Sequence, residues 1–327
     1  MDADVTSGCT RHDLEPQLFE AHLGQSALSM PGKPEITVFY EPDTHTVCSV
    51  VVDPLTKKAA VIDSVLGFEF SSGNTSTAHA DQVIEFIQQN GLDLEYILET
   101  HAHADHLSAA PYIQGRLGGK IGIGEHIRIV QDVFSGVFNL GPDFKKDGSQ
   151  FDKLFADGEV FNLGELDASV LYTPGHTPAC VCYHIGDALF TGDTLFMPDY
   201  GTARCDFPGG SSKTMYSSVQ KILSLPDETR VFVGHDYLPK EGRKDFAWET
   251  TIGEQRRNNI HIGGGKSEEE FVQMRDSRDA QLAVPKLIVP SVQVNIQAGR
   301  LPEPASNGKV YLSVPINVLS NTGSLNP

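Results

Sequence analysis

Short apolar runs recur along the chain, and four of them are followed by residue types that commonly bind metal ions. The runs cover residues 94–100, 168–172, 188–191 and 230–233, and their length and their branched and aromatic content are typical of buried strands. Histidine or aspartate follows each run within a few residues. Because loops that follow strands hold side chains on a rigid frame, the pattern predicts one site assembled from four loops.

Other segments have the pattern of helices or of antiparallel strands. Residues 78–90 have apolar positions at helical spacing and stop at Gly91, which predicts a helix with His79 on its exposed face. A second helix is predicted over residues 107–117. Residues 35–62 contain several short β-rich runs broken by turn residues, as in meandering antiparallel strands.

The C-terminal part differs in composition from the rest. Ser267 followed by Glu270 is the signature of a capping box, so a helix is predicted over residues 267–283. Residues 284–327 are punctuated by proline and are predicted to form a tail. The GGGKS segment resembles half of a phosphate-binding loop, but Ile260 stands where that pattern requires glycine, so we expect no nucleotide there.

Seven histidine and aspartate residues follow the four strand-like runs. The segment THAHADH at residues 100–106 contains four of them, and each later run contributes one. Clustered histidines can simply decorate a surface, but the recurrence after three further strands argues against this reading. Imidazole and carboxylate together suit zinc, iron or manganese better than calcium. The candidate ligands are His101, His103, Asp105, His106, His176, Asp193 and His235.

The overall charge excludes some classes of partner. The 327-residue chain has 25 Lys and Arg against 43 Asp and Glu, a net charge of −18, whereas binding to nucleic acid or to an anionic membrane needs clustered basic residues. We therefore expect no nucleic acid and no membrane as partner. No apolar run approaches the length of a membrane span, and the first residues do not have the pattern of a secretory signal, which predicts a cytoplasmic protein.

The cysteines do not have the pattern of a disulfide framework. Their count of 5 is odd, and no C-x-x-C motif is present. On a strand, Cys180 and Cys182 would share one face but lie too far apart for an easy bond. Cys180 could handle transferred sulfur as a thiol near the site, although a small buried hydrophobic residue is the interpretation we favour.

In their order and spacing, the seven candidate ligands resemble the signature of the metallo-β-lactamase superfamily, H-x-H-x-D-H followed by His, Asp and His. The resemblance covers roughly residues 34–250 and implies an α/β fold, a four-layer αβ/βα sandwich with the metal site at one edge of two packed sheets. It divides the chain into an N-terminal extension (1–33), a catalytic domain (34–250) and a C-terminal helical extension with a tail (251–327). We expect the last part to pack on the core or across a subunit interface.

Within that superfamily the chain is most similar to the persulfide dioxygenases, also called sulfur dioxygenases, and to the β-lactamase hydrolase-like proteins. The motifs that carry the likeness are residues 100–106, His176-Thr177 with Cys180 and Tyr183, residues 201–207, and His235-Asp236-Tyr237. The resemblance implies one Fe(II) per chain held by His101, His176 and Asp193, with zinc as a possible substitute. Such a facial triad leaves positions open for a sulfur atom, O2 or water.

The same resemblance implies roles for the remaining residues. His103, Asp105, His106 and His235 would form an outer shell that orients the ligands and relays protons, or a second metal site. Arg204 would bind a substrate carboxylate, with a surface Arg paired to Asp206 as the alternative. Tyr237 would hydrogen-bond substrate or bound oxygen, or would be an ordinary core tyrosine.

The implied activity is that of a non-haem iron persulfide dioxygenase, which oxidises glutathione persulfide or a similar small persulfide with O2 to sulfite and free thiol. The main alternative is a binuclear thioester hydrolase of the glyoxalase II type, because the same seven ligands can hold two metals that share Asp193. A catalytically silent sulfur-binding protein is a third possibility, although no ligand is missing here. We expect the chain to form a homo-oligomer, a dimer or a tetramer.

Overall fold

The structure is a computed structural model that describes residues 32–319 of the chain. The predicted N-terminal extension, residues 1–33, therefore lies almost entirely outside the described residues. The same holds for the last residues of the predicted tail, 320–327.

The first half of the chain builds a six-stranded sheet with the strand order β1-β2-β3-β6-β8-β9. The first three strands pair antiparallel, which confirms the predicted meander over residues 35–62, whereas β3, β6, β8 and β9 pair in parallel. The strands are β1 (Glu35–Glu41), β2 (Thr46–Val52), β3 (Lys58–Ile62), β6 (Asp93–Leu98), β8 (Lys120–Gly124) and β9 (Lys153–Phe155).

Helices cover the outer face of this sheet, and a small three-stranded sheet lies beside it. The order of the small sheet is β5-β4-β7. Apolar side chains of the helices and of the large sheet form one cluster that includes Ile84, Ile113 and Phe134. The elements are α1 (Ala78–Gln89), α2 (Ala110–Leu117), α3 (Ile127–Val137), β4 (Val65–Glu69), β5 (Asn74–Ser76) and β7 (Leu107–Ser108).

The second half of the chain repeats this plan with a second six-stranded sheet and its own helices. The strand order is β10-β11-β12-β13-β14-β15. Helices pack on its outer face around Met215, Val219 and Phe271. The elements are β10 (Val160–Leu163), β11 (Leu166–Tyr172), β12 (Val181–Ile185), β13 (Ala188–Phe190), β14 (Arg230–Phe232), β15 (Glu249–Thr251), α4 (Ser212–Leu223), α5 (Ile252–Asn258) and α6 (Glu268–Asp279).

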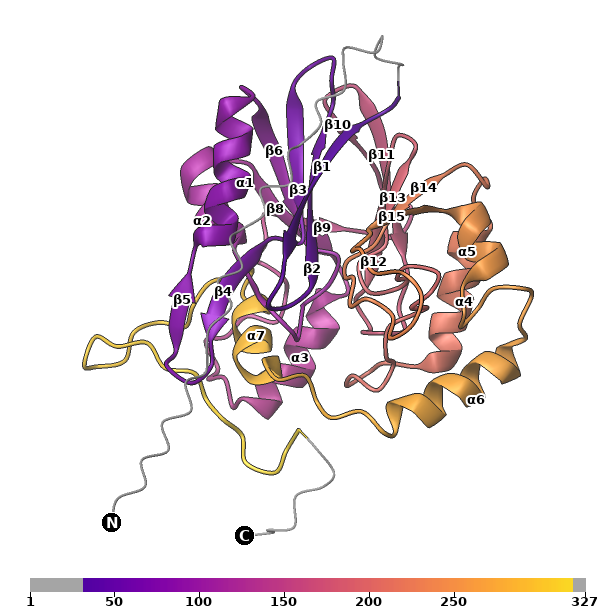
Figure 1. Cartoon of the computed structure of the whole chain (residues 1–327). Coiled ribbons are helices and arrows are strands. Elements are labelled where there is room, and N and C mark those ends of the chain that lie inside the picture. Colours follow the sequence, from indigo (N-terminus) through magenta and orange to yellow (C-terminus); the bar gives the residue numbers. More distant parts are fainter. Residues whose placement is uncertain (1–31, 320–327) are drawn as a thin grey trace, which may run out of the picture.

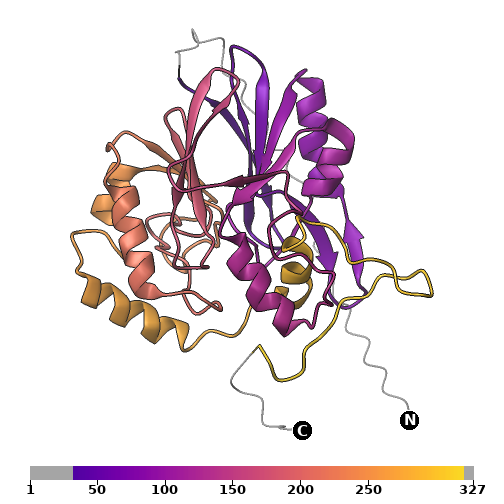
Figure 2. The same cartoon turned by 180° about the vertical axis from the view of Figure 1, so that it is seen from behind.

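The two sheets pack face to face, with helices on both outer sides (Figures 1 and 2). A cluster of apolar side chains from both sheets fills the space between them, including Ile62 and Leu98 from the first sheet and Tyr183 and Phe190 from the second. The predicted four-layer αβ/βα sandwich is therefore confirmed.

One further helix, α7 (Ile288–Asn295), comes from the C-terminal segment but packs on the helical layer of the first half. Figure 1 shows it beside α3, on the opposite side of the molecule from α6, which precedes it in the chain. The sequence predicted only a tail here, because Pro290 and the branched side chains disfavour a helix. Burial of Ile288 and Val292 in the first core cluster outweighs that local preference.

Three other expectations need correction. The helix predicted over 107–117 begins at Ala110, because Leu107 and Ser108 pair with β4 as the strand β7. The helix predicted over 267–283 ends at Asp279. His79, expected to be exposed, is half-buried, and its Nε2 atom lies 3.2 Å from the carbonyl oxygen of Phe39.

No helix in the described part of the chain combines the length and the apolar character that crossing a membrane requires.

The predicted capping box at the start of α6 is confirmed, because Ser267 Oγ accepts from the Glu270 amide and Glu270 Oε2 accepts from the Ser267 amide. We expect Ser267→Ala to lower the free energy of unfolding by about 1 kcal/mol, measured from urea unfolding curves. Ser277→Ala, an exposed change within the same helix, is the matched control and should not lower it. Equal unfolding midpoints for the two variants would contradict the prediction.

Candidate metal centre

All seven predicted ligands meet at one edge of the two sheets. His101, His103, Asp105 and His106 lie in the loop after β6, and the other three follow β11, β13 and β14. β11 and β13 are both antiparallel to β12, and β13 pairs in parallel with β14, so these three strands run in the same direction. Their C-terminal ends therefore share one edge, which places the three loops together.

The ligands form two groups, and Asp193 lies between them. The Nε2 atoms of His101 and His176 lie 3.9 and 3.6 Å from Oδ2 of Asp193. The other oxygen, Oδ1, lies 3.4 Å from Nε2 of His235. The two oxygens of one carboxylate thus face different groups of histidines.

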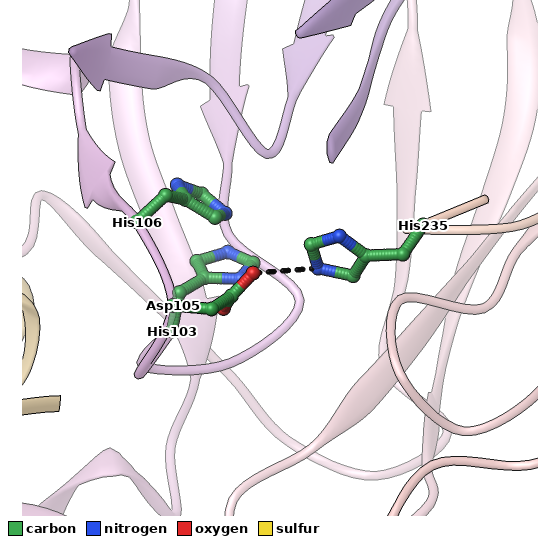
Figure 3. Close-up of side chains that lie close together, drawn as sticks. All are labelled: His103, Asp105, His106 and His235. Carbon is green, nitrogen blue, oxygen red and sulfur yellow. Dashed lines mark ion pairs between the residues drawn. The ribbon is translucent and has the colours of Figure 1, made fainter. Parts of the chain in front are cut away.

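The second group comprises His103, Asp105, His106 and His235, whose ligand atoms all lie within 4.8 Å of one another. Figure 3 shows His235 entering from the second half of the molecule toward the three residues of the loop after β6. Its Nε2 atom lies 3.2 Å from Oδ2 of Asp105. The first group, His101, His176 and Asp193, meets the same distance criterion.

Two glycines allow the loop of Asp193 to lie close to the loops of His101 and His235. Gly192 has a positive φ of 47°, and a Cβ atom there would lie 2.3 Å from Oγ1 of Thr100. Gly234 donates its amide to the carbonyl of Gly192 at 3.1 Å, and a Cβ atom on Gly234 would overlap that backbone. A side chain at either position would push apart the loops that carry the ligands.

Several of the candidate donor atoms of the site are buried without a hydrogen-bond partner among the described residues. Among the described residues, the buried side-chain atoms that lack a hydrogen-bond partner include His101 Nε2, His103 Nδ1, His106 Nε2, Asp105 Oδ2 and Asp193 Oδ1. Unpaired buried polar atoms are rare in folded proteins, and here they converge on one place. The chemistry and direction of these atoms fit a metal ion.

Acceptors behind the histidines fix which ring nitrogen carries the proton. His176 Nδ1 lies 2.8 Å from the carbonyl of Arg204, which can only accept, so Nδ1 donates and Nε2 keeps its lone pair. The Thr100 hydroxyl donates to Asp63 and therefore accepts from Nδ1 of His101, 3.0 Å away. His106 Nδ1 faces the carbonyl of Leu107 at 3.3 Å. This arrangement is typical of histidines that bind metals.

His103 is held through its other ring nitrogen, Nε2, by two buried carboxylates. Its Nε2 atom lies 3.0 Å from Oδ1 of Asp63 and 3.1 Å from Oε2 of Glu99, which leaves Nδ1 directed to the centre. Burial alone would lower the pKa of His103, but Asp63 and Glu99 outweigh it and raise the pKa well above its usual value.

Burial shifts the pKa of other ligands. It lowers the pKa of His101 well below its usual value, and it lowers the pKa of His106 to about 3, with the neighbouring His103 adding to both effects. Both rings are therefore neutral, which is the form that binds metals. Burial also raises the pKa of Asp193, although His235 and His176 act against it.

The two predicted substrate-binding residues lie on different sides of the centre. Tyr237 stacks on the ring of His235, with centroids 5.3 Å apart and an interplanar angle of 13°. Arg204 follows the loop of Asp193, and its guanidinium makes two hydrogen bonds with the carboxylate of Asp206, at 2.5 and 2.6 Å. The pairing with Asp206 is the alternative that the sequence left open, and the role of Arg204 in binding substrate stays a prediction.

The cysteines near the centre are buried thiols. Cys48, Cys180, Cys182 and Cys205 are all free, as expected for the pair Cys180 and Cys182. Burial raises the pKa of Cys180 to about 12, and its Sγ atom lies 3.1 Å from the Thr177 hydroxyl. A thiol in this state is a poor nucleophile, which supports its interpretation as a small hydrophobic residue.

Three supporting residues were not identified from the sequence. Asp63, Glu99 and Thr100 orient His101 and His103, yet they appeared only as the ends of strands. Their position was the available signal, because Glu99 and Thr100 directly precede the first ligand and Asp63 ends a neighbouring strand of the same sheet.

The fold and the clustered ligands define a metal-binding protein of the α/β sandwich class. The model of the metallo-beta-lactamase superfamily matches residues 42–235. The chain belongs to this superfamily, as its ligand signature predicted.

Three relatives show which kinds of superfamily member the chain is similar to. The chain is 47% identical to a beta-lactamase hydrolase-like protein of Xylella fastidiosa, over 97% of this chain and 74% of the relative. It is 50% identical to the glyoxylase B2 of Dictyostelium discoideum, over 89% of this chain and 99% of that protein. It is 30% identical to the mitochondrial persulfide dioxygenase ETHE1 of Mus musculus, over 80% of this chain and 87% of that protein.

A solved structure supports the same comparison. ETHE1 from Myxococcus xanthus superposes with a TM-score of 0.64 and 28% sequence identity, and the match covers 81% of this chain and 100% of that chain. The predicted resemblance to the beta-lactamase hydrolase-like proteins and to the persulfide dioxygenases is confirmed.

We expect Gly192→Ala to reduce the metal content per chain, because the new Cβ atom would displace Thr100, which holds both Asp63 and His101. Elemental analysis of the purified variant measures this directly. Gly91→Ala is the matched control, since Gly91 also has a positive φ, 61°, but has no atom within 4 Å of the added Cβ. Wild-type metal content in Gly192→Ala would show that the loop tolerates the change.

Proposed function

We propose that the protein is an Fe(II)-dependent persulfide dioxygenase, with glutathione persulfide or a similar small persulfide and O2 as substrates. The sulfane sulfur is oxidised by O2 to sulfite, the S–S bond breaks, and the thiol is released. Water supplies the third oxygen of sulfite, and two protons are released. A cytoplasmic location, a homo-oligomeric state and the absence of nucleic-acid and membrane partners remain predictions.

The observation that carries the proposal is the convergence of His101, His176 and Asp193. Both imidazoles direct Nε2 toward one carboxylate oxygen, Oδ2 of Asp193, and both are held from behind at Nδ1. Two neutral imidazoles and one carboxylate on one face of a metal ion are the ligand set of non-haem Fe(II) oxygenases. Zinc would fit the same donors.

The second group of ligands is less well supported as a separate metal site. Nδ1 of His235 is buried and has no hydrogen-bond partner among the described residues, so no acceptor behind the ring orients it as His101 and His176 are oriented. Asp63 and Glu99 raise the pKa of His103 well above its usual value, which disfavours the neutral ring that binds metals. We therefore assign His103, Asp105, His106 and His235 to an outer shell that orients the triad and moves protons.

In this proposal each residue of the site would have its own role in the reaction. Fe(II), when bound, would bring sulfur and O2 together at its open positions. His101, His176 and Asp193 would hold it, and the buried site would exclude bulk water from the reacting sulfur. Tyr237, which stacks on His235, would donate a hydrogen bond to the substrate. Arg204 could bind a substrate carboxylate if that group replaced Asp206.

A binuclear thioester hydrolase of the glyoxalase II type is the second candidate. It is favoured by the position of Asp193, whose two oxygens face the two groups and could bridge two metals. It is also favoured by the relative named glyoxylase B2. Against it stand the likeness to persulfide dioxygenase ETHE1 and the absence of a hydrogen-bond acceptor for Nδ1 of His235 among the described residues.

Oxygen uptake by anaerobically iron-loaded protein given glutathione persulfide tests the proposal directly. We expect rapid O2 consumption, stoichiometric sulfite and about one iron per chain. The control is the same sample given S-lactoylglutathione. Hydrolysis of that thioester, two metals per chain and no O2 uptake would move the assignment to the hydrolase.

Single-ligand variants separate one metal from two. We expect His176→Ala to lose its iron, because it removes a member of the triad, and His235→Ala to keep about one iron per chain. Metal analysis and electron paramagnetic resonance of the nitrosyl adduct would record both. Loss of iron from His103→Ala but not from His176→Ala would overturn the division into triad and outer shell.

A further inference from the structure

Helix α7 carries one buried polar side chain to the back of the loop that bears four of the ligands. Ile288 and Val292 face the first core cluster, and Asn295 follows them on the same side of the helix. Its exposed fraction is 4%. An amide this deeply buried requires partners, and all of its side-chain partners lie in residues 103–108, in the loop and in the strand β7 that follows it.

Three hydrogen bonds join Asn295 to that loop. Its Nδ2 atom donates to the carbonyl of His103 at 2.9 Å and to the carbonyl of His106 at 2.8 Å. Its Oδ1 atom accepts from the amide of Ser108 at 2.9 Å. Two acceptors and one donor surround the amide, so reversing it would break all three bonds, and its orientation is unique.

The loop has little backbone support of its own. Within the described part of the chain, residues 101–106 belong to no helix or strand and make no backbone–backbone hydrogen bond. The carbonyls that Asn295 binds belong to His103 and His106, whose side chains direct unpaired nitrogens into the centre. A shift of either carbonyl would therefore move a ligand candidate.

The helix that carries Asn295 is itself fixed on both sides. The carbonyl of Ile296 accepts from Gln131 of α3 at 2.9 Å. Gly299 lies so close to the loop that a Cβ atom there would be 2.9 Å from the carbonyl of Ser108. Asn295 is thus a rigid support rather than a mobile contact.

We propose that Asn295 is a positioning residue of the metal centre, supplied by a segment that lies beyond the superfamily match at residues 42–235. It holds the carbonyls of His103 and His106, and thereby fixes the loop that also carries His101. The inference rests on the proposed metal centre, but it applies equally to one metal or two. Its readout is metal affinity, which does not depend on the reaction.

The test is a titration of metal-free full-length protein with cobalt(II), followed by visible absorbance. We expect the Kd for cobalt(II) to rise about 10–100-fold in Asn295→Ala, the usual effect of losing an outer-shell partner. Asn295→Asp should weaken binding as well, because a carboxylate keeps the acceptor for Ser108 but loses both donors. The volume of that side chain is nearly unchanged, so it remains informative if the alanine variant does not fold.

Gln293→Ala is the matched control on the same helix. Gln293 is also a buried amide, but it bonds Ser313 in the tail, through Nε2 at 2.9 Å and Oε1 at 2.8 Å. We expect this variant to lower the thermal midpoint while leaving the affinity for cobalt(II) at the wild-type value. Hydrogen exchange should show loss of protection at the Ser108 amide in Asn295→Ala, which removes its acceptor, and not in Gln293→Ala.

Each outcome decides the inference. Wild-type affinity for cobalt(II) in folded Asn295→Ala and Asn295→Asp would overturn it. An equal loss of affinity in Gln293→Ala would also overturn it, because the effect would then come from the docking of the helix. If the wild-type chain bound no cobalt(II), the metal centre itself would be contradicted and the inference would fall with it. Failure of persulfide oxidation with normal cobalt(II) binding would contradict only the proposed reaction.

Discussion

The structure depends on keeping several polar atoms buried and unpaired at one point. His101, His103 and His106 each direct into the interior a ring nitrogen that has no hydrogen-bond partner, and Asp105 and Asp193 add carboxylate oxygens in the same state. Each such atom costs about 1–3 kcal/mol unless a partner satisfies it. Metal binding satisfies atoms of this kind, and the fold must hold the cluster in place against this cost.

The two-sheet architecture holds the cluster in place because the residues that stabilise the sheets are separate from those that form the metal centre. The cores on both faces of each sheet fix the strands, and the ligands lie only in the loops beyond the strand ends. A further layer of acceptors behind the rings sets their protonation: Thr100 for His101, Arg204 for His176, and Asp63 with Glu99 for His103. The chemistry therefore depends on groups that never touch the metal.

The local sequence pattern predicted the strand ends and the seven candidate ligands, and the resemblance to the superfamily that they carry implied the sandwich fold. Apolar runs that end in histidine or aspartate fixed the strand ends, and the H-x-H-x-D-H segment fixed the main loop. Helix α7 was not predicted, because Pro290 and the branched residues disfavour a helix and only burial of its apolar side chains stabilises it. Asn295 could not be predicted, because its partners are 187 to 192 residues away along the chain.

The C-terminal segment supports two of the loops around the centre, each through a different helix. Helix α7 holds the loop after β6, whereas α6 holds the loop after β13: Arg275 donates to the carbonyl of Thr202 at 3.1 Å, and Asp279 accepts from the amide of Cys205 at 2.7 Å. Between them lies the Arg204 carbonyl, which orients His176. Because both loops are held from behind by residues outside the superfamily match, this segment can alter the spacing of the ligands without changing any ligand. Differences in metal and reaction among proteins that share the same seven ligands can therefore arise in such outer segments.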